Sequence, residues 1–128
     1  MLTLASTPKS ISRIEPFVET LISKYSISPE LYGNILISVT EAVTNAIVHG
    51  NNADESKNVF VKCLKKRDHL AIQVCDEGGG FDFDNLPDPT APENILKIGG
   101  RGVFLMKQLS DDVKFIENGR IVEIQFSI

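Results

Sequence analysis

Residues 37–50 read Ile-Ser-Val-Thr-Glu-Ala-Val-Thr-Asn-Ala-Ile-Val-His-Gly, and this stretch carries the strongest structural signal in the chain. Its polar residues Glu41, Asn45 and His49 recur every four positions, so on a helix they form one stripe, each rotated by about 40° from the last. Such a stripe ordinarily faces solvent on an amphipathic helix. Here apolar residues surround it, which favours a stripe that faces a ligand cavity.

Two residues of this stripe have complementary chemistry. The Glu41 carboxylate can accept a proton from an attacking hydroxyl group. Asn45, one turn later, offers a neutral oxygen of the hard kind that Mg²⁺ prefers. A general base beside a magnesium ligand indicates phosphoryl transfer. His49 stands next to the glycine that ends the helix, and we expect its role to be structural.

Capping and turn signals outside this stretch predict the other elements. Ser28-Pro29-Glu30 places a capping serine before a first-turn proline, and Gly50 provides the stop. Asn118-Gly119 is a strong two-residue hairpin turn. The expected helices cover residues 7–25, 28–50 and 102–109. The expected strands cover residues 1–6, 58–66, 70–76, 113–117 and 120–128.

These elements predict a two-layer α/β sandwich. Four or five strands form a single sheet of mixed, mostly antiparallel direction, and the three helices share one face because no second set covers the other. A chain of 128 residues has room for one core, so we expect residues 1–128 to form a single domain.

A second group of polar and glycine residues, Asp76-Glu-Gly78-Gly-Gly80-Phe-Asp82, follows the strand over 70–76. A carboxylate there can accept hydrogen bonds from an amine, while bare glycine backbone lets a flat ring approach closely. This arrangement fits purine recognition. A glycine-rich turn that merely ends the strand is an equally common alternative.

A third group, Ile98-Gly-Gly100-Arg101-Gly102, reads as a glycine loop that leads into the last helix. Unpaired N–H groups at a helix N-terminus favour anions, and Arg101 can add a positive charge, so the loop is a candidate phosphate site. It is neither a Walker A loop nor a dinucleotide-binding fingerprint. The aperiodic segment 77–100 before it is long enough to suggest a functional loop.

Composition argues against several classes of protein. The net charge of −4 disfavours nucleic acid as a partner. No run approaches the ~18 consecutive apolar residues of a membrane span, and no signal core follows the N-terminus, so we expect a cytoplasmic protein without a membrane partner. Cys63 and Cys75 are expected as buried free thiols, and the two histidines lack the companions that a zinc site requires.

Taken together, the three groups resemble the N, G1 and G2 boxes of the GHKL superfamily, whose members share the Bergerat ATP-binding fold. The matching patterns are Glu41-x-x-x-Asn45, Asp76-x-Gly78-x-Gly80 and Gly100-x-Gly102. Within the superfamily, the sequence of residues 38–50 and 99–113 is similar to that of the anti-sigma-factor serine/threonine kinases. The resemblance covers nearly the whole chain.

The resemblance implies a role for each matched residue. Glu41 would act as the base towards a protein serine, Asn45 would bind the Mg²⁺ that bridges the ATP phosphates, and Asp76 would hold the adenine amino group. The matched glycines would let the chain pass close to the nucleotide or hinge a lid over residues 83–98; they are Gly78, Gly80, Gly100 and Gly102. Arg101 is our own addition, as a phosphate contact.

The chain departs from the family pattern at two places. Val103 replaces a leucine that is usual in the G2 box, a change of one methylene in a packing role. Relatives often begin the last strand with Gly-Thr, where the threonine supports the adenine-binding aspartate, and this chain has Gly119-Arg120. The second departure bears on the adenine side of the site rather than on the phosphate side.

The resemblance implies an anti-sigma regulatory factor that binds ATP and Mg²⁺, sequesters a sigma factor and phosphorylates a serine of an anti-anti-sigma protein. Family members often pair as homodimers. An alternative is a nucleotide-binding partner-switch module without kinase activity. A stand-alone histidine kinase catalytic domain is disfavoured, because no dimerisation helix with a phospho-accepting histidine is present in the sequence.

Overall fold

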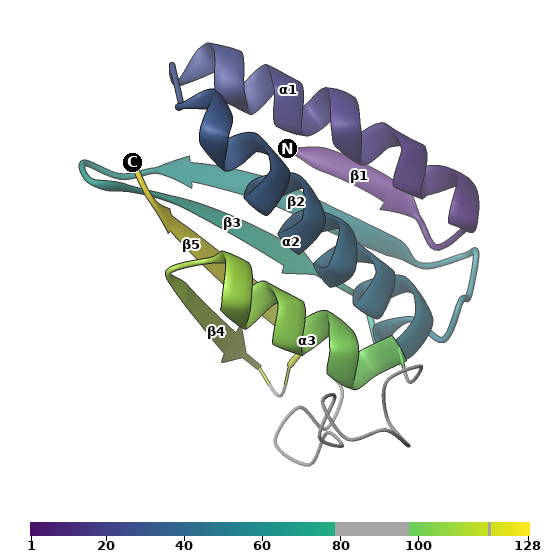
Figure 1. Cartoon of the computed structure of the whole chain (residues 1–128). Coiled ribbons are helices and arrows are strands. Elements are labelled where there is room, and N and C mark those ends of the chain that lie inside the picture. Colours follow the sequence, from purple (N-terminus) through teal and green to yellow (C-terminus); the bar gives the residue numbers. More distant parts are fainter. Residues whose placement is uncertain (79–97, 118) are drawn as a thin grey trace.

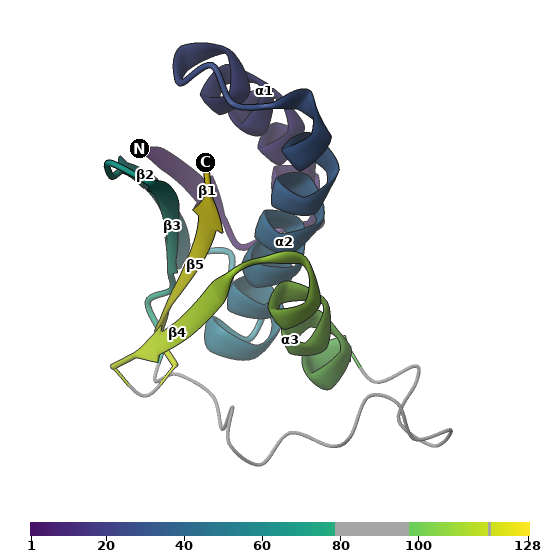
Figure 2. The same cartoon turned by 60° about the vertical axis from the view of Figure 1, so that its left-hand side comes forward.

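A five-stranded sheet with helices on one face forms the protein (Figure 1; Figure 2). The structure is a computed structural model that describes residues 1–78, 98–117 and 119–128, with only the backbone described over 98–101. The second face of the sheet carries none of the described helices. This arrangement confirms the predicted two-layer sandwich.

The strands run antiparallel at every described pairing. In the sheet they follow the order β1-β2-β3-β5-β4, which refines the expected mixed, mostly antiparallel sheet. Their bounds are β1 (Leu2–Ala5), β2 (Asn58–Lys65), β3 (His69–Cys75), β4 (Asp112–Ile116) and β5 (Ile121–Ser127). The central strand, β3, therefore lies between β2 and β5 and leads directly into Asp76.

The predicted helices are present, but their winding is less uniform than expected. The segments are η1 (Pro8–Arg13), α1 (Ile14–Lys24), η2 (Pro29–Leu31), α2 (Tyr32–Asn45), η3 (Ala46–Gly50) and α3 (Ile98–Leu109). The predicted helix over 28–50 is thus a 3₁₀ turn, an α-helix and a π-turn in succession. Its predicted cap is confirmed, because the Ser28 side chain accepts a hydrogen bond from the Glu30 backbone N–H at 3.4 Å.

The start of α3 differs from the prediction. The helix begins at Ile98 rather than at Gly102, so Gly100 and Gly102 lie in its first turns instead of in a loop before it. Glycine has the poorest helix propensity after proline, which is why the sequence reads here as a loop.

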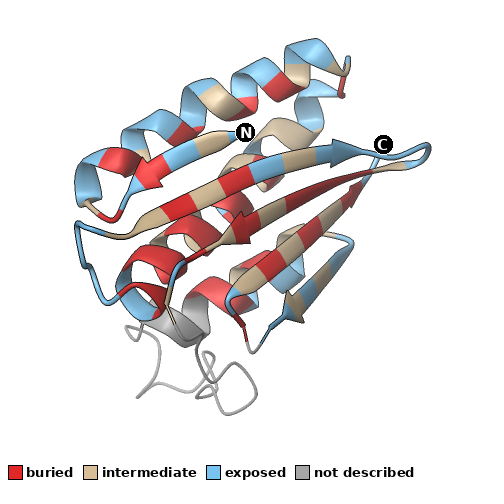
Figure 3. Cartoon of the chain, turned by 180° about the vertical axis from the view of Figure 1, so that it is seen from behind, coloured by how far each residue is buried: buried red, intermediate tan, exposed pale blue. Residues whose placement is uncertain are grey.

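The hydrophobic core lies between the sheet and α2. Alternate residues of β2 and β5 face the helices, and Figure 3 shows the resulting alternation of buried and more exposed positions along these two strands. In β3, Leu70, Ala71 and Ile72 are buried in succession. Residues with no exposed surface include Leu70 and Ile72 of β3 and Ile35 and Val39 of α2. Within the described residues, the segment Pro29–Gly50 is long and apolar enough to pass a composition test for a membrane span. Its packing on the sheet accounts for this apolarity, as expected for a core helix.

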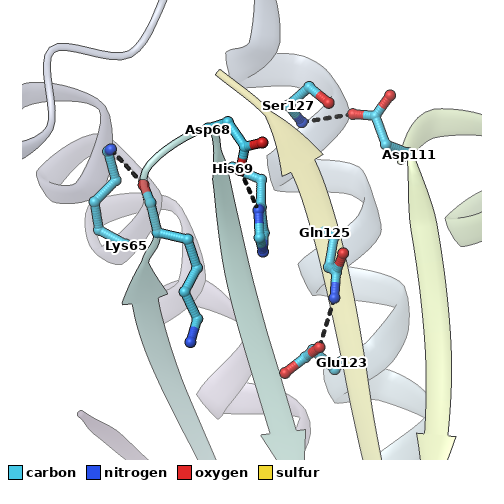
Figure 4. A network of polar contacts seen from close by, with 8 residues as sticks. Lys65, Asp68, His69, Asp111, Glu123, Gln125 and Ser127 are labelled. Carbon is cyan, nitrogen blue, oxygen red and sulfur yellow. Dashed lines mark hydrogen bonds and ion pairs between the residues drawn. The ribbon is translucent and has the colours of Figure 1, made fainter.

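Polar side chains lie at the end of the sheet farthest from Asp76 and continue along β5 to Glu123 (Figure 4). Asp68 pairs with Nδ1 of His69 at 2.8 Å, and Asp111 accepts a hydrogen bond from the Ser127 backbone at 2.6 Å. Glu123 accepts from the Gln125 amide at 2.7 Å. These contacts satisfy groups at the strand ends and at half-buried positions of β5, and they lie outside the site described below.

The prediction that Cys63 and Cys75 are buried is wrong. Both are free thiols, as expected, but they are half-buried rather than buried. Cys63 packs against the edge of the core, whereas Cys75 pairs with Phe60 and so lies on the face that no described helix covers. Burial raises the pKa of Cys63 to about 11 and also raises the pKa of Cys75.

Leu70→Ala and Leu64→Ala form a matched test of the core. Leu70 has no exposed surface and Leu64 is 40% exposed, so we expect Leu70→Ala to lower the free energy of unfolding by about 2–5 kcal/mol and Leu64→Ala by about 1 kcal/mol or less. Urea denaturation measures both. Equal losses would contradict the placement of the core on the Leu70 side of the sheet.

Candidate functional site

A pocket lies where the end of α2, the end of β3 and the middle of α3 meet. Its walls are mostly apolar, with three polar or charged side chains among them. The lining residues are Ala42, Asn45, Ala46, Val74, Asp76, Met106, Phe115, Gly119, Arg120 and Val122. The cavity among them has a volume of about 10 Å³, room for about one water molecule, so a larger ligand enters only if the walls move apart.

Asp76 is the buried carboxylate of this pocket, with only 6% of its surface exposed. Its Oδ1 accepts a hydrogen bond from the Gly78 backbone N–H at 2.8 Å, and its own N–H donates to the carbonyl of Arg120 at 3.0 Å. Burial raises the pKa of Asp76, and the Gly78 N–H and the charges of Arg120 and Lys57 offset part of that rise. A carboxylate held in this way can accept a hydrogen bond from an amine on a flat ligand.

Asn45 is buried in the wall of the same pocket, with 2% of its surface exposed, and neither Oδ1 nor Nδ2 of its side chain has a hydrogen-bond partner among the described residues. An unsatisfied buried polar group costs about 1–3 kcal/mol. Among the described side chains, only the Ser38 hydroxyl shares this state, and it does not line the pocket. An unpartnered amide in a pocket wall indicates a ligand that supplies the missing contact.

Glu41 and Asn45 lie together under the first turns of α3. A Cβ added at Gly102 would lie 2.8 Å from the Asn45 Nδ2 and 3.1 Å from the Glu41 Oε2. Gly102 therefore has its bare backbone against both side chains, and a larger residue there would have to displace them. The structure thus brings together Glu41, Asn45 and Gly102, as the sequence predicted.

His49 leaves the predicted stripe. It is exposed, whereas Glu41 is half-buried and Asn45 is buried. The reason is the π-turn of η3, in which the Asn51 N–H bonds to the carbonyl of Ala46, five residues earlier, at 2.8 Å. The wider winding of a π-turn rotates later residues away from α-helical positions, so His49 points out of the site.

Gly50 is a site residue that sequence reasoning assigned only as a helix stop. A Cβ at Gly50 would lie 2.2 Å from Oδ2 of Asp76, and a Cβ at Gly78 would lie 1.7 Å from the Gly50 carbonyl oxygen. Both glycines are required for space. Such a requirement arises from a contact between distant segments, so the local sequence carries no signal for it. The same holds for the buried Asn51, which follows Gly50.

Arg120 is the residue at which the sequence departs from the Gly-Thr pattern that the resemblance implies. It lines the pocket, its carbonyl accepts the Asp76 N–H, and its guanidinium pairs with the Glu117 side chain. The departure noted in the sequence therefore places a cation in the pocket wall beside Asp76. That charge lowers the pKa of Asp76 against the effect of burial.

Several predicted site residues stay predictions. Gly80 and the predicted lid over 83–98, apart from Ile98, lie outside the described residues, and so does the side chain of Arg101. The backbone of Gly100 lies in the first turn of α3, where N–H groups have no partner within the helix.

Comparisons with known proteins extend over nearly the whole chain. The profile of the histidine kinase-like ATPase domain matches residues 4–126. The serine-protein kinase RsbW of Listeria monocytogenes serovar 1/2a is 30% identical over 119 residues, which cover 88% of this chain and 76% of the relative. RsbW of Bacillus licheniformis is 32% identical over 124 residues, which cover 91% of this chain and 78% of the relative.

A solved structure shares the fold. The histidine kinase domain from the Erythrobacter litoralis EL346 blue-light activated histidine kinase superposes with a TM-score of 0.54 at 21% identity. The alignment covers 92% of this chain and 59% of that chain, so this chain spans less than two thirds of that protein's length. The likeness concerns the arrangement of sheet and helices.

Gly50→Ala tests the contact with Asp76. Its Cβ would fall within the Asp76 carboxylate, so we expect a loss of about 1–3 kcal/mol in the free energy of unfolding. Gly33→Ala is the matched control: a Cβ there meets nothing within 4 Å, and alanine in a helix gains about 0.5–1 kcal/mol over glycine. Denaturant unfolding of both variants measures the difference, and a stabilised Gly50→Ala variant would contradict the close contact.

Asp76→Asn tests the raised pKa. Because the pKa of Asp76 is above its ordinary value of 3.8, the folded state binds the proton more tightly than the unfolded chain does. The free energy of unfolding therefore falls as the pH rises through the folded pKa and the buried carboxyl loses its proton. We expect Asp76→Asn to unfold at higher denaturant than wild type at pH 7, and the gap to shrink as pH falls towards 4. A wild type that is more stable than the variant at pH 7 would contradict this account.

Proposed function

This chain belongs to the histidine kinase-like ATPase domain family, and on this premise we propose that it is an ATP-dependent protein serine kinase that acts as an anti-sigma regulatory factor. One observation carries the proposal: the unpartnered Asn45 amide lies one helical turn from Glu41, in the wall of the pocket that holds Asp76. The relatives named serine-protein kinase add support. Residues 1–128 act as one domain of this kind, in the cytoplasm.

The adenine ring binds at this pocket after its apolar walls move apart, because the cavity of about 10 Å³ is too small for a purine. Asp76 accepts a hydrogen bond from the exocyclic amino group of the bound ring. The Gly78 N–H fixes the direction of the carboxylate through Oδ1. Recognition by a carboxylate favours adenine over a base that presents a carbonyl oxygen at the same position.

Asn45 fits a magnesium ligand. Its oxygen is neutral, buried and without a partner among the described residues, and Mg²⁺ takes hard oxygen ligands while it keeps several waters and nucleotide phosphates. Held by Asn45 together with ATP, such an ion would neutralise charge on the phosphates. The site's second support for the phosphates is the N-terminus of α3, with Gly100, Arg101 and Gly102, together with Gly80 after β3.

Glu41 acts as the base. It lies beside Asn45 under Gly102 and is only half-buried, so a serine hydroxyl of a partner protein can reach it. Glu41 accepts the hydroxyl proton while the serine oxygen bonds to the γ-phosphorus, and the bond to the β-phosphate oxygen breaks to release ADP. The contribution of the protein is orientation of the two reactants.

The partners are proteins. The kinase sequesters a sigma factor and phosphorylates a serine of an anti-anti-sigma protein, which silences that protein. Homodimerisation belongs to the same proposal. A second candidate, a partner-switch module that binds nucleotide without transferring phosphate, is favoured by one observation: the charged side chain of Arg120 lines the proposed adenine pocket beside Asp76.

Glu41→Gln separates these candidates. We expect the variant to bind ATP with nearly wild-type affinity, because the residue is not assigned to nucleotide binding, and to transfer phosphate about 10²–10⁴-fold more slowly. The assay incubates the protein with γ-labelled ATP, Mg²⁺ and an anti-anti-sigma protein from the same genome. Glu30→Gln, an exposed residue of η2, is the matched control and keeps wild-type transfer.

Two outcomes would count against the kinase. Wild-type transfer by Glu41→Gln would overturn its assignment as the base. A wild-type protein that binds ATP and leaves the partner unlabelled would favour the partner-switch module instead.

A further inference from the structure

Asn51 is a buried polar side chain to which the proposed reaction assigns no role. It has no exposed surface and follows Gly50 directly at the end of the π-turn. Its side chain makes three hydrogen bonds: Nδ2 donates to the Ser6 hydroxyl at 2.9 Å and to the Asn58 carbonyl at 3.0 Å, and Oδ1 accepts from the Glu77 N–H at 2.8 Å. A satisfied buried amide of this kind fixes its neighbours in place.

The partners fix the orientation of the amide. The Asn58 carbonyl can only accept a hydrogen bond, and the Glu77 N–H can only donate one, so Nδ2 must face Asn58 and Oδ1 must face Glu77. The three bonds connect the turn after α2 to the chain after β1, to the start of β2 and to the chain after β3. Asn51 thus joins four segments of the chain, two of which, around Ser6 and Glu77, are distant from it in sequence.

Asp76 lies between two backbone anchors. On one side its own N–H bonds to the Arg120 carbonyl at 3.0 Å. On the other side the next residue, Glu77, bonds through its N–H to Asn51, and the Glu77 carboxylate accepts from the Asn58 N–H. The first anchor fixes the end of β3, and the second fixes the chain that carries Gly78 to the Asp76 carboxylate.

We propose that Asn51 is a positioning residue for base recognition: its hydrogen bond to Glu77 holds the Asp76–Gly78 turn so that the Asp76 carboxylate points at the exocyclic amine of a bound purine. The inference rests on the proposed ATP site. Without this bond, residues 77 and 78 can shift, the Gly78 N–H leaves Oδ1 of Asp76, and the carboxylate loses its fixed direction. Asn51 itself touches neither base nor phosphate and acts through Asp76.

The preference for ATP over inosine triphosphate (ITP) separates this role from a merely structural one. Inosine carries a carbonyl oxygen in place of the adenine amino group, so Asp76 has no proton to accept from it. A loss of folded protein lowers binding of both nucleotides equally and leaves their ratio unchanged. Misplacement of Asp76 lowers ATP affinity alone and reduces the ratio.

The experiment measures the dissociation constants of ATP and ITP by calorimetry, with Mg²⁺ and the full chain. We expect wild type to prefer ATP, and Asn51→Ala to reduce that preference about tenfold, the equivalent of one lost hydrogen bond to a charged group. The side chain of Asn51→Ser is too short to accept the hydrogen bond from the Glu77 N–H, so we expect the same reduction in ATP preference. This variant replaces Asn51→Ala in the test if the alanine variant does not fold. In the Asp76→Asn background, Asn51→Ala changes the preference no further.

Two control variants separate the anchor from its surroundings. Ser6→Ala removes one partner of Nδ2 and leaves the bond to Glu77, so it lowers thermal stability but keeps the wild-type ATP preference. Asn52→Gly changes the adjacent exposed asparagine, whose φ of 52° glycine adopts without strain, and leaves both properties unchanged.

The possible failures are distinct. If wild type binds ATP and prefers it to ITP, and both Asn51 variants keep that preference while unfolding more easily, Asn51 is structural only and the inference is overturned. If wild type binds neither nucleotide, the proposed function fails and the inference falls with it.

Discussion

The site depends on one close contact, in which the bare backbone of Gly50 meets the Asp76 carboxylate and the backbone of Gly78. No side chain fits at either glycine, so the end of η3 and the chain after β3 approach as closely as two backbones can. This contact brings the helix that carries Glu41 and Asn45 to the strand that carries Asp76. The phosphate and adenine sides of the proposed nucleotide site are therefore held at a fixed separation by packing in the protein itself.

Much of the fold follows from local sequence. Alternation in β2 and β3 sets one buried face, the Ser28 cap sets the start of the long helix, and both signals depend only on residues a few positions apart. The assignment of Glu41, Asn45 and Gly102 to one place rested on the order of three motifs. The structure brings these three residues together because α3 packs along α2 with Gly102 at the contact.

Other features of the site could not be predicted, because they arise from contacts between distant segments. The π-turn that takes His49 out of the stripe begins only at Ala46, after a regular α-helix. Gly50 reads as a helix stop, yet its lack of a side chain is needed by Asp76. The sequence carries no signal for Asn51, whose hydrogen bonds to Ser6, Asn58 and Glu77 join separate segments of the folded chain. The sequence marks Arg120 as a departure on the adenine side of the site, but its place in the pocket wall is visible only in the structure.

The central claim is that the unpartnered amide of Asn45 binds Mg²⁺ together with ATP. The Mg²⁺ dependence of ATP binding tests this claim most directly. Calorimetric titration of wild type and Asn45→Ala with ATP, with and without Mg²⁺, makes the comparison. The account predicts that Mg²⁺ strengthens ATP binding to wild type by about tenfold or more and has little effect on Asn45→Ala. An equal Mg²⁺ effect on both proteins, or no binding of ATP to wild type, would contradict it.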